Sequence, residues 1–97
     1  MKLRYSQRAK RDLDSIGDYI RERNPEAALR VRAAIVRSLR TLVMFPHIGR
    51  QQNALGVRKL VRHRYPYLVY YVVDDSLEEI VILTIQHPAR DRPSSDA

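Results

Sequence analysis

The apolar residues of this chain change their spacing once along the sequence, and this change limits the folds that the chain can form. In the first half they recur at steps of three and four residues, as on one face of an α-helix: Ala9, Leu13, Ile16 and Ile20, then Ala28, Val31, Ile35, Leu39 and Leu42. After residue 56 they form short runs typical of β-strands, at 57–62, 67–73 and 79–86. The order predicts an α+β fold in which a pair of helices precedes most of the sheet.

Local signals set the boundaries of these elements. Ser6 is placed to cap the first helix, and Asn24-Pro25 separates the two helices because Asn caps well and Pro suits a first helical position. Residues 2–5 alternate apolar and basic side chains, which predicts a short first strand. We therefore expect an N-terminal strand and an antiparallel helical hairpin packed on an antiparallel sheet, which a C-terminal three-stranded meander completes.

Further expectations concern the sheet and the domain limits. Residues 67–73 are apolar at every position, which predicts a central strand covered on both faces. Residues 46–56 contain Gly49 and Gly56 and are expected to form an irregular connection. We expect one domain over 1–90 and a polar, disordered tail over 91–97.

The charge balance predicts an anionic partner. The 97 residues contain 18 Lys and Arg against 11 Asp and Glu, a net charge of +7, which favours nucleic acid, a nucleic-acid enzyme or an acidic polypeptide. There is no Cys, which excludes disulfides and thiolate catalysis. The run Ile80 to Ile85 is too short to span a bilayer and the first residues do not read as a signal peptide, so no membrane association and a cytoplasmic location are expected.

Several classes of catalytic and cofactor site lack their sequence patterns. No His or carboxylates occur at metal-ligand spacing with a third ligand nearby, so no metal is expected. There is no Gly-x-Ser-x-Gly turn and no glycine-rich phosphate loop. We therefore expect no cofactor.

Basic and aromatic residues gather in the second half of the chain. The basic residues Arg50, Arg58, Lys59, Arg62, His63 and Arg64 have no carboxylate among them, and Tyr65, Tyr67, Tyr70 and Tyr71 follow. Cations beside aromatic rings are typical of nucleic-acid binding, although tyrosines in an apolar strand also serve as core. His87 ends the last strand near Arg90, a place suited to acid-base work or to a phosphate contact because His titrates near neutrality.

The order of several short segments resembles the RelE/ParE superfamily of bacterial toxins. The segments are Ser6 to Asp18, the turn Phe45-Pro46-His47-Ile48-Gly49-Arg50, Val57-Arg58, Tyr65 to Tyr71 and Ile82 to Arg90. The resemblance implies the toxin of a type II toxin-antitoxin system, as found in plasmid stabilization. It also implies a hetero-oligomer with a cognate, ParD-like antitoxin whose acidic amphipathic segment lies on the helical hairpin, at Leu13, Ile16, Ile20, Val31 and Ile35.

The superfamily contains two kinds of toxin, and the sequence is more similar to one of them. RelE-like and YoeB-like members are ribosome-dependent mRNA endonucleases, whereas ParE-like members poison DNA gyrase. Where YoeB-like chains have a Glu-His-Arg triplet, this chain has Tyr65-Pro66-Tyr67, and the RelE-like loop lysines are replaced within 51–56. The Pro-x-x-Gly turn, the strand led by Arg58 and the His87 with Arg90 three residues on resemble the ParE-like branch.

The resemblance thus implies a gyrase inhibitor that acts by binding and has no catalytic residues of its own. Its target-binding residues would be Arg50, Arg58, Arg62, His87 and Arg90. The alternative is a RelE/YoeB-like ribosome-dependent mRNA endonuclease with the ribosome and mRNA as partners, in which Arg58, His87 and Arg90 would be catalytic. A third reading, a simple nucleic-acid-binding module, predicts affinity that falls steeply with salt.

Overall fold

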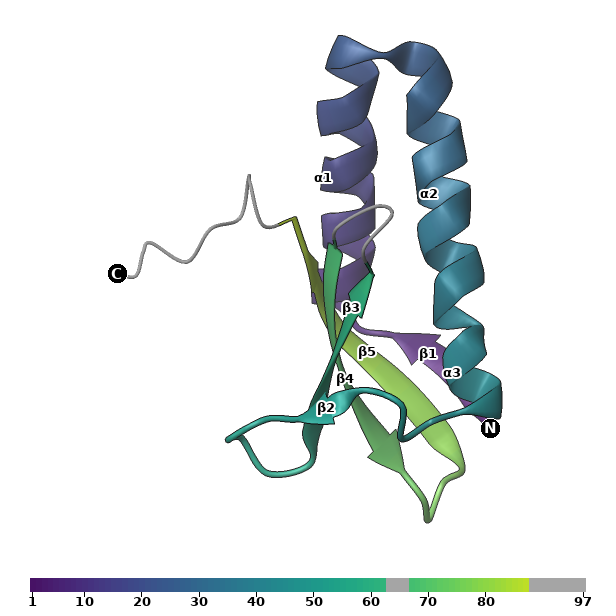
Figure 1. Cartoon of the computed structure of the whole chain (residues 1–97), viewed down its shortest axis with the longest axis vertical. Helices are drawn as coiled ribbons and strands as arrows, with labels where there is room; N and C mark the ends of the chain where they lie inside the picture. Colours follow the sequence, from purple (N-terminus) through teal and green to yellow (C-terminus); the bar gives the residue numbers. More distant parts are fainter. Residues whose placement is uncertain (63–66, 88–97) are drawn as a thin grey trace.

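A computed structural model describes residues 1–62 and 67–87, which form a helical hairpin packed on a five-stranded sheet (Figure 1). The elements, in chain order, are β1 (Lys2–Tyr5), α1 (Gln7–Arg23), α2 (Pro25–Leu39), α3 (Thr41–Met44), β2 (Arg50–Gln51), β3 (Val57–Arg62), β4 (Tyr67–Asp74) and β5 (Glu79–Gln86). Figure 1 shows α1 and α2 side by side, with their connection beyond one end of the sheet. The α+β class and the helical hairpin are confirmed; the predicted tail lies outside the described residues.

Both predicted helix starts carry the expected caps. The Ser6 hydroxyl accepts a hydrogen bond from the Ala9 amide at 3.0 Å, and the Asn24 side chain accepts one from the Ala27 amide at 3.1 Å. Each cap satisfies an amide that has no partner inside its helix. The second helix is shorter than the apolar spacing predicts, because α2 ends at Leu39 and the one-turn helix α3 follows.

The sheet has the strand order β1-β5-β4-β3-β2. Strands β3, β4 and β5 form the predicted antiparallel meander. The expectation of a wholly antiparallel sheet is wrong, because β1 pairs with β5 in parallel and the sheet is mixed. A helical hairpin separates β1 from the meander, so the direction of β5 is not set by a tight turn from β1. The connection predicted over 46–56 contains the two-residue strand β2.

A register shift in β5 is stabilised by side chains from the start of α1. The shift lies opposite Tyr70 and Tyr71, whose partners on β5 are Thr84 and Ile82. The Ser6 hydroxyl donates to the Leu83 carbonyl at 2.7 Å, and the Asp12 carboxylate accepts from the Ile85 amide at 3.0 Å. Because a bulge removes backbone groups from the ladder, these two side chains supply the missing partners and attach α1 to the sheet.

Only one face of the sheet is covered by helices. On β4, Tyr67, Val69 and Tyr71 are buried in the core shared with α1 and α2, whereas the alternating Leu68, Tyr70 and Val72 are half-buried. The prediction that this strand is covered on both faces is therefore wrong, although β4 is central in the sheet. We call the side that carries Leu68, Tyr70 and Val72 the open face.

The fully buried side chain of Tyr71 organises the turn that precedes β2. Its hydroxyl donates to the Pro46 carbonyl at 2.8 Å and accepts from the Gly49 amide at 2.8 Å. The turn approaches the ring so closely that a Cβ atom on Gly49 would lie 2.6 Å from the Tyr71 hydroxyl oxygen. The Pro-x-x-Gly spacing is thus explained by packing: the turn needs a residue without a side chain above a buried ring.

We predict that Gly49→Ala lowers the free energy of unfolding by about 1 to 3 kcal/mol, because the ring that meets the new methyl is fully buried and has no space to move. Gly17→Ala is the matched control. At Gly17, in α1, the nearest atom to an added Cβ is the Arg21 Nη2 at 4.0 Å, so this change should be neutral or stabilising. Urea denaturation followed by circular dichroism measures both; equal effects would contradict the packing argument.

Candidate target-binding surfaces

The residues predicted to bind a target lie in two separate places on the sheet. In one place, Arg62 on β3 is the partner of Tyr67 on β4, and His87 contacts the Tyr67 ring from the end of β5. In the other place, Arg50 on β2 is the partner of Lys59, and Gln51 is the partner of Arg58. Arg90 lies outside the described residues, and so does the side chain of Arg62.

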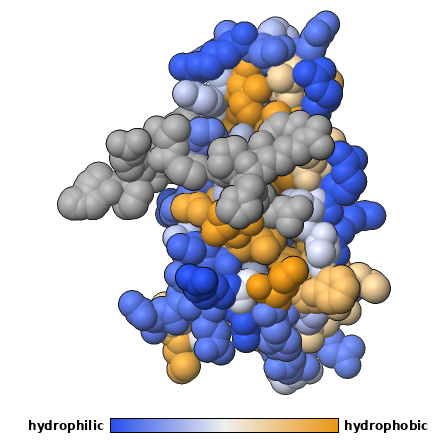
Figure 2. All heavy atoms as spheres, in the orientation of Figure 1, coloured by the Kyte–Doolittle hydropathy of each residue, from blue (hydrophilic) through white to orange (hydrophobic). Residues whose placement is uncertain are grey.

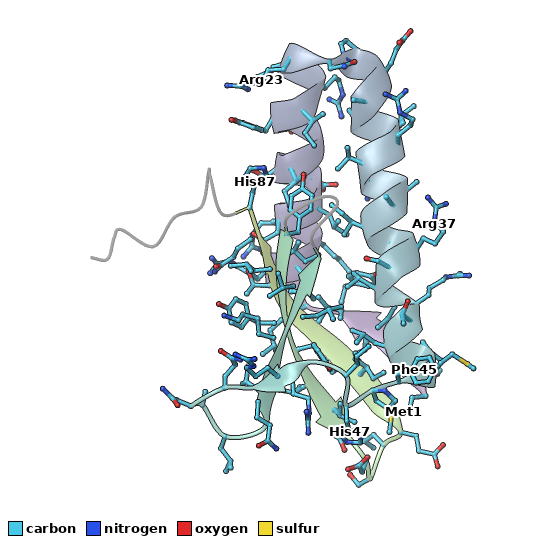
Figure 3. All side chains as sticks on the ribbon, in the orientation of Figure 1. Met1, Arg23, Arg37, Phe45, His47 and His87 are labelled. Atoms are coloured by element: carbon cyan, nitrogen blue, oxygen red, sulfur yellow. The ribbon has the colours of Figure 1, made fainter. Side chains whose placement is uncertain are left out.

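His87 belongs to an aromatic cluster between the sheet and α1. Its ring centroid lies 5.2 Å from that of Tyr67 and 6.0 Å from that of Tyr19, and the Arg23 guanidinium lies 3.9 Å from the Tyr19 centroid. Burial raises the pKa of the Tyr67 hydroxyl. Figure 3 shows His87 beside α1 and Arg23 near the helix end. The contribution of Tyr19 and Arg23 was missed in the sequence, since only the tertiary fold brings α1 to the end of β5.

The Arg58 side chain forms hydrogen bonds within the molecule, to the backbone of the turn that contacts Tyr71. Its Nη1 donates to the Gly49 carbonyl at 2.7 Å and to the His47 carbonyl at 3.1 Å. Arg58 is the cross-strand partner of Tyr71, so both side chains lie on the helix-covered side of the sheet. Burial raises the pKa of the Tyr71 hydroxyl, and the Gly49 amide and the Arg58 charge oppose that rise. Arg58 and Tyr71 therefore hold the 46–49 turn together.

Arg58 and His87, two of the three residues predicted to be catalytic in the endonuclease alternative, are far apart; the third, Arg90, lies outside the described residues. Arg58 lies beside Tyr71, whereas His87 lies beside Tyr67, four residues away along β4, or about 13 Å. They are also two strands apart, which adds about 10 Å across the sheet. In Figure 3, His87 and His47, whose carbonyl binds Arg58, lie at opposite ends of the sheet. The fold does not bring these two side chains into one site.

Most of the residues predicted to bind an antitoxin are part of the chain's own core. Leu13, Ile16, Val31 and Ile35 are 3% to 7% exposed, and Ile20 is half-buried against the same cluster. The helical spacing identified an apolar face correctly, but that face packs between α1, α2 and the sheet. The predicted antitoxin contacts at Ile16, Val31 and Ile35 are therefore corrected, because these side chains are covered by the chain's own core, whereas Leu13 also lines a surface hollow.

An accessible apolar groove lies instead at the foot of the hairpin, beside β1. Its volume is about 560 Å³, and the residues that line it are Leu3, Tyr5, Val36, Arg40, Val43 and Met44. A second hollow of about 360 Å³ shares Tyr5 and Val36 and adds Lys10, Leu13, Asp14 and Arg32. Figure 2 shows apolar surface bordered by hydrophilic residues on this side of the molecule. The apolar lining and the nearby cations suit an apolar segment with acidic flanks.

The strand beside this groove has a free edge. Strand β1 lies at one end of the sheet order and pairs only with β5 in the described part of the chain. On the β5 side, the amides of Lys2 and Ser6 donate to the carbonyls of Glu78 and Ile82, each at 2.9 Å. Because successive residues of a strand direct their backbone groups to opposite sides, those of Leu3 and Tyr5 face away from β5. In the described part of the chain no other strand pairs with this edge.

Residues 1–62 and 67–87 lack two other classes of site. In these ranges no group of three His, Cys, Asp or Glu side chains is arranged to hold a metal ion. None of the helices there has the length and apolar character needed to cross a bilayer.

Comparison with known proteins identifies relatives over nearly the whole chain. The family model of the ParE toxin of the type II toxin-antitoxin system parDE matches residues 3–92. The chain is 36% identical over 92 residues to Y4kP of Sinorhizobium fredii, which is named as a toxin, covering 95% of this chain and 93% of that protein. It is 39% identical over 83 residues to toxin RelE2 of Caulobacter vibrioides, covering 86% and 90%.

The fold is also similar to a solved toxin structure. The chromosomal ParDE toxin-antitoxin system from P. aeruginosa contains a chain that superposes with a TM-score of 0.79 and 33% sequence identity, over 90% of this chain and 95% of that chain. The names of these relatives include both ParE and RelE. The choice between the two activities therefore rests on the geometry of the site.

We predict that Arg58→Gln lowers the free energy of unfolding by about 1.5 to 3 kcal/mol, because charged hydrogen bonds to the His47 and Gly49 carbonyls are lost. Arg50→Gln, the matched control, should change it by less than about 0.5 kcal/mol, since Arg50 is exposed. Thermal denaturation followed by circular dichroism compares the two. Equal stabilities would show that Arg58 is not needed to hold the turn.

Proposed function

Because the chain belongs to the ParE toxin family of type II toxin-antitoxin systems, we propose that it inhibits DNA gyrase by binding and that a cognate antitoxin neutralises it. The observation that carries the choice of a binding mechanism is the separation of Arg58 from His87. RNA cleavage needs a proton-transferring group and a cation at the same phosphate, within hydrogen-bond reach of the reacting atoms. Arg58 lies beside Tyr71, four residues along β4 from the Tyr67 that His87 contacts, and Arg58 is bound to two backbone carbonyls.

The structure describes the side chains of two of the proposed target contacts, Arg50 and His87. Arg50 is exposed, and His87 is half-buried at the edge of the aromatic cluster. We keep Arg50, Arg62, His87 and Arg90 as proposed contacts with the target and give Arg58 a positioning role, since its guanidinium fixes the turn that leads into Arg50. Arginine suits a partner that presents carboxylates or phosphates, because its planar group binds either in a bidentate manner.

We place the antitoxin in the groove beside β1. The groove is lined by apolar side chains and Arg40, and the adjoining hollow adds Lys10 and the pair Arg32 and Asp14, which lie 3.8 Å apart. The cations Arg40 and Lys10 match a segment that alternates apolar and acidic residues. Burial raises the pKa of the Tyr5 hydroxyl, and Arg40 and Arg32, which line the two hollows with it, oppose that rise. The free edge of β1 offers the backbone groups of Leu3 and Tyr5 to an extended segment.

We predict that the chain, freed of its antitoxin, abolishes the supercoiling of relaxed plasmid by purified gyrase when it is in molar excess, and that linear plasmid accumulates because broken DNA is trapped. The control is the same chain bound to its antitoxin, which should leave supercoiling unchanged. Normal supercoiling at excess toxin would overturn the proposal. Cleavage of translated mRNA by the chain on ribosomes would favour the endonuclease alternative.

We predict that Met44→Asp weakens antitoxin binding by about tenfold, or about 1.4 kcal/mol. The new carboxylate would lie in the apolar groove and repel the acidic side chains of the antitoxin. Met44 is 73% exposed, so the variant should fold normally. Leu55→Asp is the control, since Leu55 is fully exposed in the connection between β2 and β3 and far along the sheet from β1. Titration calorimetry with the antitoxin encoded beside the toxin gene measures both; equal affinities would remove the groove as the docking site.

A further inference from the structure

Two cations face each other across β2 and β3 on the edge of the sheet opposite β1. Arg50 and Lys59 are cross-strand partners. Like charges in this position repel each other and destabilise the pair of strands. Neither side chain has a salt bridge within the described part of the chain, and Arg50 is exposed while Lys59 is half-buried. The fold therefore gains no stability from this pair of charges.

The two cations lie on the open face, in a row with a tyrosine. Lys59 is the partner of Tyr70 on β4, so Arg50, Lys59 and Tyr70 follow one another across three strands. The neighbours of Lys59 on either side, Arg58 and Leu60, belong to the helix-covered face, the first in the turn and the second in the core. Because side chains alternate along a strand, Lys59 points to the open face. Tyr70 is half-buried there.

Among the described residues, one acidic group lies near this row, and it is already paired: the Asp12 carboxylate accepts a hydrogen bond from Thr84, the partner of Tyr70 on β5, and lies 3.6 Å from Arg8. Every Asp and Glu of the sequence lies at or before Glu26, or at or after Asp74. Asp74 is four residues beyond Tyr70 on β4, or about 13 Å, which exceeds the screening length at moderate salt. At the same end of the sheet, Glu79 is 3.7 Å from Arg4. The row thus keeps its positive charge.

We infer that the row Arg50, Lys59 and Tyr70 is a binding site for the phosphate backbone of single-stranded nucleic acid. A phosphodiester placed between two opposed cations relieves their repulsion, and the arginine donates to it in a fixed geometry. Tyr70 supplies an aromatic surface on which the adjoining base stacks, an arrangement typical of sheets that bind single strands. The inference goes beyond the proposed function, because it concerns nucleic acid itself; its failure would leave gyrase inhibition in place.

The test is fluorescence anisotropy of a labelled single-stranded oligodeoxynucleotide titrated with the chain freed of its antitoxin, repeated over a range of salt. Arg50→Gln combined with Lys59→Gln should weaken binding at low salt by at least about tenfold. The slope of log affinity against log salt should fall by about 1.4, because each lost phosphate contact on a single strand is worth about 0.7. Circular dichroism checks that the variant is folded, and Arg50→Gln alone should lower the slope by about half as much.

The matched control removes two charges from another surface. Arg30 and Arg37 are exposed on α2, and Figure 3 shows Arg37 pointing away from the molecule. The double variant Arg30→Gln and Arg37→Gln should lower the slope of log affinity against log salt by less than half as much as the double variant Arg50→Gln and Lys59→Gln. Equal effects of the two pairs would overturn the proposal, because they would show attraction by net charge alone. Absence of binding by the unmodified chain at low salt would also overturn it.

Two further measurements separate nucleic acid from an acidic polypeptide. Tyr70→Leu should weaken oligonucleotide binding by about tenfold, since the stacking surface is lost. Polyglutamate of equal charge should displace the oligonucleotide poorly. An unchanged affinity in Tyr70→Leu, or displacement by polyglutamate at equal concentration, would overturn the proposal in favour of a site for carboxylates.

Discussion

The arrangement of the functional surfaces depends on the burial of one polar side chain, Tyr71. Its hydroxyl lies at the end of the core and exchanges hydrogen bonds with the backbone of Pro46 and Gly49. A buried hydroxyl without partners would be costly, so the turn must approach the ring, and only a glycine permits that approach. Arg58 then completes the turn from the neighbouring strand. Once Arg58 is committed to the helix-covered face, the alternation of β3 places Lys59 on the open face.

This division explains why a chain rich in Arg, His and Tyr need not be a nuclease. The residue types for proton transfer and for charge stabilisation are present, but the fold places Arg58 apart from His87 and directs Arg58 and Lys59 to different faces of the sheet. His87 packs among the rings of Tyr19 and Tyr67, and Arg58 binds backbone carbonyls. Such an arrangement suits recognition of a large partner, where separate contacts add up, better than chemistry at a single atom.

The two edges of the sheet have different chemistry. Beside β1 the surface is an apolar groove with cations along it and a free backbone edge, which suits a polypeptide segment. Beside β2 the surface carries an aromatic ring and two opposed cations that form no salt bridge with the described residues, which suits a phosphate backbone. The helical hairpin covers one face and leaves the other free, so both edges remain accessible on the same folded chain.

The sequence by itself determined the first strand, the two long helices, the three strands of the meander and their order. Helical spacing, the caps Ser6 and Asn24 and the three apolar runs predicted two helices followed by a meander, and the order of short segments indicated the toxin family; these features are local, so they can be read without a structure. Contacts between distant residues were decided only by the tertiary structure. It made β1 parallel to β5, buried the helical face assigned to an antitoxin, and separated Arg58 from both Lys59 and His87. The physical reason is that spacing along the chain shows which residues share a face of one element, whereas the packing of elements decides whether that face meets the core, a turn or solvent.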